Sequence, residues 1–466
     1  MEKIKIGFIP AHRNIFSSDW AINMKERTLQ TLSKIDFIEV VTPTNEITTN
    51  GLVENEDDAK KTIQLFLDSK IDALLIGTMT FGEELPIMSI AEVFKDIPIM
   101  LFGTKEGPFK NDGCRSSDSF CGTLSISSGL YRRSIQFIFL GIVFPEESIF
   151  LKKLLSFTQT IVAVKGFQKT KVGLIGSRPY PFETCTINEA NLIRKFGVRV
   201  MPISLLTIKD EMDKIKDNDK LVGHIIDEIK SKADCSLVKD SNLIKLAKLE
   251  IILMGHVTKE NLSSLALSCW PEIPSIMNVS PCLTASRLTE KGIPTACEAD
   301  IYGALTMLAQ YLISFESAVP HFIDWTIQNQ AEENSFLSWH CGNAPMCLVE
   351  KGGKIAVKEN SSGSLAYGKE HTEGAVEFQL KSGIVSLNRL VEYDGKFKML
   401  ITNGEVKNKQ MNLRGSWCWV EVNDLQNLYN KLVMEGFVHH ASMVYENYSK
   451  PMIDFCEMLK IEKIII

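Results

Sequence analysis

The sequence predicts an α/β protein in which two α/β domains with parallel sheets are followed by a β-rich C-terminal domain. The chain has 466 residues, more than the roughly 250–300 that one hydrophobic core accommodates. Its first part alternates continuous apolar runs with helical patterns, which is typical of β-α-β units around a parallel sheet. After about residue 345, alternating apolar and polar residues between glycines indicate antiparallel strands instead.

The first α/β domain is predicted over residues 1–165. Its apolar runs, each of the length of a buried strand, are 4–10, 37–41, 72–78 and 97–103. Helical spacing follows the first three runs at about 19–34, 57–69 and 86–95. The stretch 119–165 has mostly helical character and leads out of this domain.

The same pattern restarts at "KVGLIGSRP" and predicts a second α/β domain over residues 166–340. After the strand at 171–179, its predicted elements are a helix at about 186–196, a strand at 198–204, two helical runs, an apolar strand at 250–256, a helix at 299–315 and a strand at 318–327. Glu298 and Asp300 stand at the N-terminal end of the helix at 299–315.

The third domain is predicted over residues 341–466. The runs "GKIAVKE", "GAVEFQL", "GIVSLNRLVEYDGKFKMLITNGEV" and "GSWCWVEV" are predicted as strands joined by glycine turns. Residues 423–437 have helical spacing, and 448–466 are predicted as a helix followed by a strand.

Composition narrows the class of function. The net charge is −6 and no Lys/Arg run is dense, which disfavours nucleic acid as a partner. The longest apolar run, residues 134–144, is shorter than the ~18 residues of a membrane span. The start "MEKIKIGFIP" is too charged for a signal peptide. The eleven cysteines include no CxxC pair, which favours buried thiols in a reducing cytoplasm over a disulfide framework.

Four short stretches hold metal-ligand types of side chain. They are "ACEADIYGAL" with Glu298, "HFIDWT" with Asp324, "SWHCGN" with His340, and "GFVHHASMVY" with His439 and His440. Two carboxylates and two imidazoles suit Mn²⁺, and also Mg²⁺, Co²⁺ or Zn²⁺. The spacing is unlike that of any compact metal motif, so the fold has to assemble such a site.

Each of these residues also has a purely structural interpretation. Glu298 is also explained as a first-turn helix acid, and Asp324 as a turn residue at the end of an apolar strand. His340 beside a tryptophan fits a core histidine with satisfied hydrogen bonds. If Cys297 and Cys341 also faced the ion, zinc would be the better assignment.

The motifs together resemble the L-fucose isomerase and L-arabinose isomerase family of ketol isomerases. "CEADIYGALTM", "FIDW", "WHCGNAP" and "HHASMVY" are similar to the family's metal-ligand segments. The resemblance implies Glu298, Asp324, His340 and His440 as ligands, with His439 as a neighbour. It also implies two Rossmann-like domains before the β-rich one, and trimers or hexamers with sites near subunit interfaces.

The resemblance implies further residues that line the substrate site. "PAHRNIFSSDWAINM" resembles the stretch through which a neighbouring subunit reaches the sugar, with Arg13 as the candidate. The loops "GTMTFGEELP" and "GSRPYPFETC" resemble the other site-lining loops. The remaining candidates for substrate binding are Thr80, Arg178, Tyr180, Phe182, Trp339, Asn343 and His439. For the second loop, a capped turn is the structural alternative.

The implied function is a cytoplasmic, metal-dependent aldose–ketose isomerase. A divalent ion on O1 and O2 of the open-chain sugar would stabilise an enediolate, with Glu298 and Asp324 as the acid–base pair. A metal-directed hydride shift is the mechanistic alternative. L-fucose or a related deoxy- or modified aldose is favoured over L-arabinose. The Glu/Asp pair resembles the fucose branch of the family, whereas His340 resembles the arabinose branch, so the motifs leave the exact sugar open. A non-catalytic sugar-binding protein and an epimerase or lyase with the same enediolate chemistry stay open.

Overall fold

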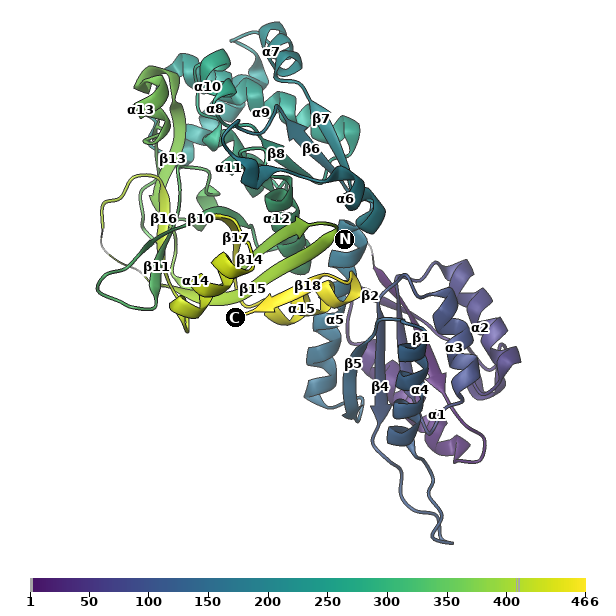
Figure 1. The fold of residues 1–466 in the computed structure, drawn as a ribbon. Coiled ribbons are helices and arrows are strands. Elements are labelled where there is room, and N and C mark those ends of the chain that lie inside the picture. Colours follow the sequence, from purple (N-terminus) through teal and green to yellow (C-terminus); the bar gives the residue numbers. More distant parts are fainter. Residues whose placement is uncertain (1–2, 408, 410) are drawn as a thin grey trace. The chain divides into compact units, whose positions relative to one another are not determined.

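The computed structural model describes residues 3–407, 409 and 411–466 (Figure 1). The chain forms two compact units, which are described one at a time. The first comprises Met1–Lys165 and Glu457–Lys460, and the second comprises Gly166–Cys456 and Ile461–Ile466. The predicted class, parallel-sheet α/β units followed by a β-rich region, is confirmed.

The first unit is built on a five-stranded parallel sheet in the order β2-β1-β3-β4-β5. Its strands are β1 (Ile4–Ala11), β2 (Ile38–Val41), β3 (Ala73–Thr78), β4 (Ile99–Thr104) and β5 (Ile138–Val143). Its helices are α1 (Ser18–Leu32), α2 (Glu56–Ser69), α3 (Glu84–Val93), α4 (Ser119–Arg132) and α5 (Ser148–Phe167), the last of which runs on into the second unit. Every residue of β3 and β4 is buried, as expected for central strands covered by helices on both faces.

One strand of this sheet lies where helix was predicted. β5 falls within the stretch 119–165, in the apolar run 134–144, and pairs in parallel with β4. Short apolar runs do not distinguish a buried strand from a helix by periodicity, which explains the error.

The second unit contains a four-stranded parallel sheet in the order β7-β6-β8-β9. The strands are β6 (Lys171–Ile175), β7 (Arg199–Ile203), β8 (Ser264–Leu267) and β9 (Thr295–Cys297). The helices of this part are α6 (Glu189–Phe196), α7 (Leu205–Lys214), α8 (Lys220–Lys232), α9 (Asp240–Glu260), α10 (Glu272–Met277), α11 (Cys282–Glu290) and α12 (Ile301–Ile313). The strand predicted at 250–256 is wrong, because the apolar residues there continue the buried stripe of α9.

The same unit contains a nine-stranded mixed sheet in the order β12-β13-β16-β11-β10-β17-β14-β15-β18. Its strands are β10 (His321–Gln328), β11 (Ser335–His340), β12 (Ala356–Glu359), β13 (Glu373–Gln379), β14 (Gly383–Tyr393), β15 (Lys396–Lys407), β16 (Ser416–Glu421), β17 (His440–Tyr445) and β18 (Glu462–Ile465). Three helices accompany them: α13 (Gly363–Tyr367), α14 (Leu425–Met434) and α15 (Ser449–Met458).

Six strands of this sheet close into a ring. β15 pairs with β16 as well as with β14, so that β16, β11, β10, β17, β14 and β15 follow one another around a barrel. β10 and β11 precede residue 341 yet belong to this sheet, and a domain boundary at 340/341 stays a prediction. Within the described residues, no helix combines the length and apolar character needed to cross a membrane.

Candidate active site

The first acidic residue of the site lies in a strained turn between the parallel sheet and a helix. β9 ends at Cys297, and Glu298 and Ala299 both have a φ of 57° before Asp300 caps α12. The Asp300 carboxylate accepts a hydrogen bond from the Gly303 N–H at 2.8 Å. A left-handed non-glycine residue costs about 1–2 kcal/mol, so two in succession indicate a turn that the surrounding fold holds in place. Glu298 therefore lies before the helix, and the first-turn interpretation is wrong.

Three adjacent strands of the barrel carry the other candidates. Asp324 on β10 is opposite His440 on β17 and opposite Trp339 on β11. His340 is the last residue of β11. Directly opposite residues share one face of a sheet, and the pairing therefore sets Asp324, His440 and Trp339 side by side.

The four candidate ligands converge on one region. His440 Nε2 lies 2.5 Å from Glu298 Oε2 and 3.7 Å from Asp324 Oδ1. Glu298, Asp324 and His340 line a cavity of 340 Å³. The ring of Phe322 contacts both imidazoles, with its centroid 4.7 Å from that of His440 and 5.7 Å from that of His340.

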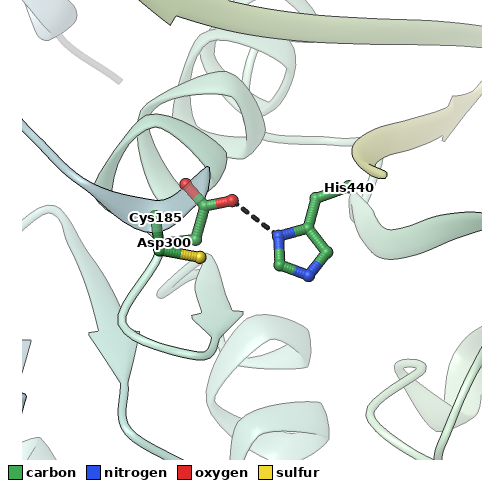
Figure 2. A group of neighbouring side chains, drawn as sticks. All are labelled: Cys185, Asp300 and His440. Carbon is green, nitrogen blue, oxygen red and sulfur yellow. Dashed lines mark hydrogen bonds and ion pairs between the residues drawn. The ribbon is translucent and has the colours of Figure 1, made fainter. Parts of the chain in front are cut away.

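A buried chain of charges fixes the orientation of His440. Its Nδ1 lies 2.8 Å from Asp300 Oδ2. Figure 2 shows this contact together with the neighbouring Cys185. Asp300 also receives two hydrogen bonds from the Arg389 guanidinium, at 2.5 and 3.1 Å. Because an ionised carboxylate only accepts, the Nδ1 of His440 bears a proton, and Nε2 presents a lone pair to Glu298 and Asp324 once its own proton is displaced.

The hydrogen bonds of His340 place its ring proton on the other nitrogen from that of His440. The backbone N–H of Cys341 donates to His340 Nδ1 at 2.9 Å, and the Cys341 sulfur lies 3.3 Å from the same nitrogen. A backbone N–H is only a donor, so Nδ1 accepts and the proton of the neutral ring lies on Nε2. His340 therefore presents an N–H where His440 presents a lone pair.

Unpartnered atoms test whether a cation fits here. Within the described part of the chain, Asp324 Oδ1 and His340 Nε2 are buried without a hydrogen-bond partner, and Glu298 Oε2 and His440 Nε2 are buried against each other as an ion pair. Buried polar atoms normally have partners. Two carboxylate oxygens and the imidazole lone pair of His440 are suitable donors for a divalent ion, whereas His340 would first have to exchange its tautomer.

The electrostatic environment separates the two carboxyl groups. Burial alone would raise the pKa of Glu298, but the neighbouring His440 and His340 hold it at about 2. Burial raises the pKa of Asp324 to about 6 against the opposing effect of the same histidines. Burial would lower the pKa of His440, but Glu298 and Asp300 raise it well above its ordinary value. The site therefore contains one firmly ionised carboxylate and one that binds a proton more readily.

The cavity wall includes several predicted substrate-binding residues. Trp339 and Phe182 line the cavity, and the Phe182 ring meets Trp270 at 5.1 Å and His439 at 5.2 Å. The His439 ring is tilted by 50° against that of His440, with ring centroids 4.0 Å apart. Asn343 is buried nearby and donates to Cys297 Sγ at 3.3 Å.

The other predicted residues have different surroundings. Arg178 donates to the carbonyls of Pro179 and Tyr180, and Tyr180 is 92% exposed, which matches the capped-turn alternative. Neither is among the residues that line the cavity.

Arg13 and Thr80 belong to the first unit. There Arg13 pairs with Glu83 at 2.8 Å, and Thr80 contacts His12 at 2.7 Å. Their part in the site stays a prediction.

Sequence reasoning missed several residues around the site. Trp270 donates to Glu298 Oε1 at 3.2 Å, and Arg389 anchors Asp300. Asp300 stands in the quoted motif "CEADIYGAL", where its capping position gave a signal. Arg389 and Trp270 gave no such signal, because nothing in their local sequence indicates which distant residues they contact.

Comparisons with known proteins agree with this architecture. Residues 7–168 match the family model "Fucose/sulfoquinovose isomerase, N-terminal domain", and residues 338–466 match "L-fucose isomerase, C-terminal domain". A sulfoquinovose isomerase of Priestia aryabhattai is 26% identical over 99% of both chains. An L-arabinose isomerase of Bacillus subtilis (strain 168) is 23% identical over 82% of this chain and 76% of its own.

A solved structure also aligns with the chain, at a low level of similarity. It is a periplasmic solute-binding protein of Actinobacillus succinogenes 130z with bound D-allose, which aligns with 68% of this chain and 93% of its own, with a TM-score of 0.17 and 11% identity. A likeness this low carries no argument.

The fold, the acid- and imidazole-lined cavity and the matches define the class of this protein as an aldose–ketose isomerase. Its two family matches cover both ends of the chain, and its relatives align over nearly all of it. The chain belongs to the L-fucose isomerase and L-arabinose isomerase family, as its motifs predicted.

Proposed function

We propose that this chain is a metal-dependent isomerase of a modified aldose, with Glu298 and Asp324 as its acid–base pair. The observation that carries the proposal is the convergence of buried donor atoms from separate segments. Glu298 comes from the turn before α12, Asp324 from β10 and His440 from β17, and the Nε2 atom of His440 lies 2.5 Å from Glu298 Oε2 and 3.7 Å from Asp324 Oδ1 beside the cavity.

Glu298, Asp324 and His440 would hold the ion, with Mn²⁺ the first choice and Mg²⁺, Co²⁺ or Zn²⁺ as alternatives. His340, the fourth ligand that the motifs imply, would join them only after its proton moves from Nε2. A bound divalent ion supplies positive charge that polarises the sugar carbonyl and stabilises negative charge developing on the sugar oxygens.

The chain's own residues then divide the remaining tasks. One of the two carboxylates takes the proton from C2 of the open-chain sugar, and the same or the facing group returns it to C1. His340, with its N–H directed away from Cys341, is placed to donate to a sugar oxygen. Trp270 restrains Glu298 through its indole N–H, and the aromatic wall limits access of water.

The substrate we propose is sulfoquinovose or a closely related modified aldose. Relatives with the name sulfoquinovose isomerase align over nearly the whole chain, including one of Alkalicoccus urumqiensis at 24% identity over 96% of both chains. This agrees with the preference for a modified aldose over L-arabinose. We further propose that the enzyme works in the cytoplasm. We also propose that it forms a homo-oligomer, a trimer or hexamer, and light scattering of the purified protein tests this oligomeric state.

The experiment is product analysis by NMR with sulfoquinovose, L-fucose and L-arabinose in the presence of Mn²⁺. We expect a 2-ketose from sulfoquinovose and no turnover in excess EDTA. Sugar binding without product would support a binding protein, and an epimer or cleaved product would support the epimerase or lyase. Solvent deuterium at C1 of the ketose would favour the enediol route, and its absence the hydride shift.

Glu298→Gln tests the catalytic assignment directly. Loss of a general acid–base group lowers turnover by about 100- to 10,000-fold, and the melting temperature should stay close to that of the parent. Glu333→Gln, at an exposed position outside the cavity, is the matched control and should leave turnover unchanged. A near-normal rate for Glu298→Gln would remove this residue from the mechanism.

A further inference from the structure

The sulfur of one cavity-lining cysteine lies next to the sulfur of a second cysteine that does not line the cavity. Cys341 follows His340 and lines the cavity, and Cys282 is the first residue of α11. Their Sγ atoms are 3.9 Å apart. Asn360, another cavity-lining residue, donates to Cys282 Sγ at 3.7 Å, which keeps that sulfur turned toward Cys341.

Both cysteines stand at the ends of elements, where small movements are tolerated. Cys341 is followed by Gly342, which has a φ of 141° in the bend after β11. Cys282 begins its helix directly after Pro281. A disulfide needs the two sulfurs at about 2.05 Å, so side-chain rotation has to bring them roughly 2 Å closer.

We propose that Cys282 and Cys341 are an oxidisable pair that closes into a disulfide at the edge of the active site. A second thiol pair, Cys269 with Cys297, lies close by in hydrogen-bond contact, and both of its members are buried. Cys341 is the partly exposed member of the group, so an oxidant that enters the cavity reaches it first.

A small organic disulfide such as 2-hydroxyethyl disulfide supplies the oxidising equivalents. The Cys341 sulfur attacks one sulfur of the reagent, the reagent's S–S bond breaks, and one 2-mercaptoethanol leaves with the proton. The Cys282 sulfur then attacks Cys341 in this mixed disulfide and expels the second 2-mercaptoethanol. The protein loses two hydrogen atoms, and one reagent molecule is reduced to two thiols.

The consequence for activity rests on the proposed function. Bond formation draws the Cys341 sulfur away from His340 Nδ1, now 3.3 Å distant, and shifts the backbone N–H that orients this ring. Loss of a group that orients a site residue typically lowers affinity or activity 10- to 100-fold. We therefore expect the oxidised enzyme to be about 10- to 100-fold less active, and dithiothreitol to restore it.

The test is peptide mapping under non-reducing conditions after treatment of the full chain with 2-hydroxyethyl disulfide. We expect one linked peptide pair that joins residues 282 and 341, and its disappearance after reduction. Cys282→Ser should stop at the mixed disulfide on Cys341 and keep its basal activity. Cys347→Ser, which removes a nearby exposed thiol, should form the link like the parent.

Two results would overturn the pair: an unmodified Cys341, or a link between residues 269 and 297 in place of the expected one. Mapping does not depend on turnover. An inactive parent enzyme would therefore refute the proposed function while the peptide result still decides the thiol pair.

Discussion

At the scale of single residues, the two imidazoles of the site differ in what they offer. Asp300 holds the proton of His440 on Nδ1, whereas the Cys341 N–H leaves the proton of His340 on Nε2. Residues of the same type, both buried and both beside carboxylates, thus present opposite hydrogen-bonding character to the same space.

This difference predicts unequal losses of metal affinity. His440→Gln removes a nitrogen that the proposed ion would use as a ligand and should weaken Mn²⁺ binding by at least about 100-fold. His340→Gln should weaken it by less than about tenfold, because the Cys341 N–H on Nδ1 leaves the ring proton on Nε2, which is then not a ligand. Isothermal titration calorimetry with Mn²⁺ and no sugar measures both variants. Equal losses would show that His340 is a ligand too.

At the scale of elements, the turn between β9 and α12 has a strained backbone that positions the Glu298 side chain. Glu298 and Ala299 are both left-handed, while the buried Arg389–Asp300 pair fixes the residue that follows them. Removing one partner of a buried ion pair costs about 3–5 kcal/mol, so this anchor is strong enough to hold the turn.

The strain predicts that Ala299→Gly is neutral or stabilising. Glycine adopts a positive φ without the penalty of about 1–2 kcal/mol, and the gain offsets the larger entropy of the unfolded chain. Ala304→Gly, in the middle of α12, is the matched control and should destabilise by about 1 kcal/mol or more. Urea unfolding of both variants measures the difference, and a large loss of stability for Ala299→Gly would contradict the interpretation.

At the scale of the whole molecule, the sequence pattern predicted the order of strands and helices better than it predicted which residues contact one another. The central strands β1, β3 and β4 are long apolar runs bounded by helical segments, and this signal is local. β5 and the run 250–256 were misassigned because short apolar runs are ambiguous between buried strand and buried helix. Asp324 and His440 are found by motif, but their pairing depends on strand register, which no local pattern encodes.

A pH effect on stability is expected from the first unit. Burial lowers the pKa of His12 from 6.5 to about 4, because the enclosed ring has no access to the water that would solvate its charged form. The unfolded chain then binds more protons below pH 6.5, and the folded state loses up to about 3 kcal/mol as the pH falls toward 4.

Calorimetry at pH 5 and pH 7.5 measures this effect. The parent should melt at a lower temperature at pH 5, and His12→Gln, which has no charge at either pH, should show a smaller difference. An unchanged pH dependence in the variant would assign the effect to other groups.

The closed ring of six strands has one consequence for how the candidate site is lost on unfolding. β11, β10 and β17 are hydrogen-bonded to one another within a closed barrel, and none of them is an edge strand. Their side chains therefore cannot separate without disruption of the barrel. Ion binding should therefore persist almost undiminished through mild denaturation and then vanish in a single cooperative step together with the barrel itself.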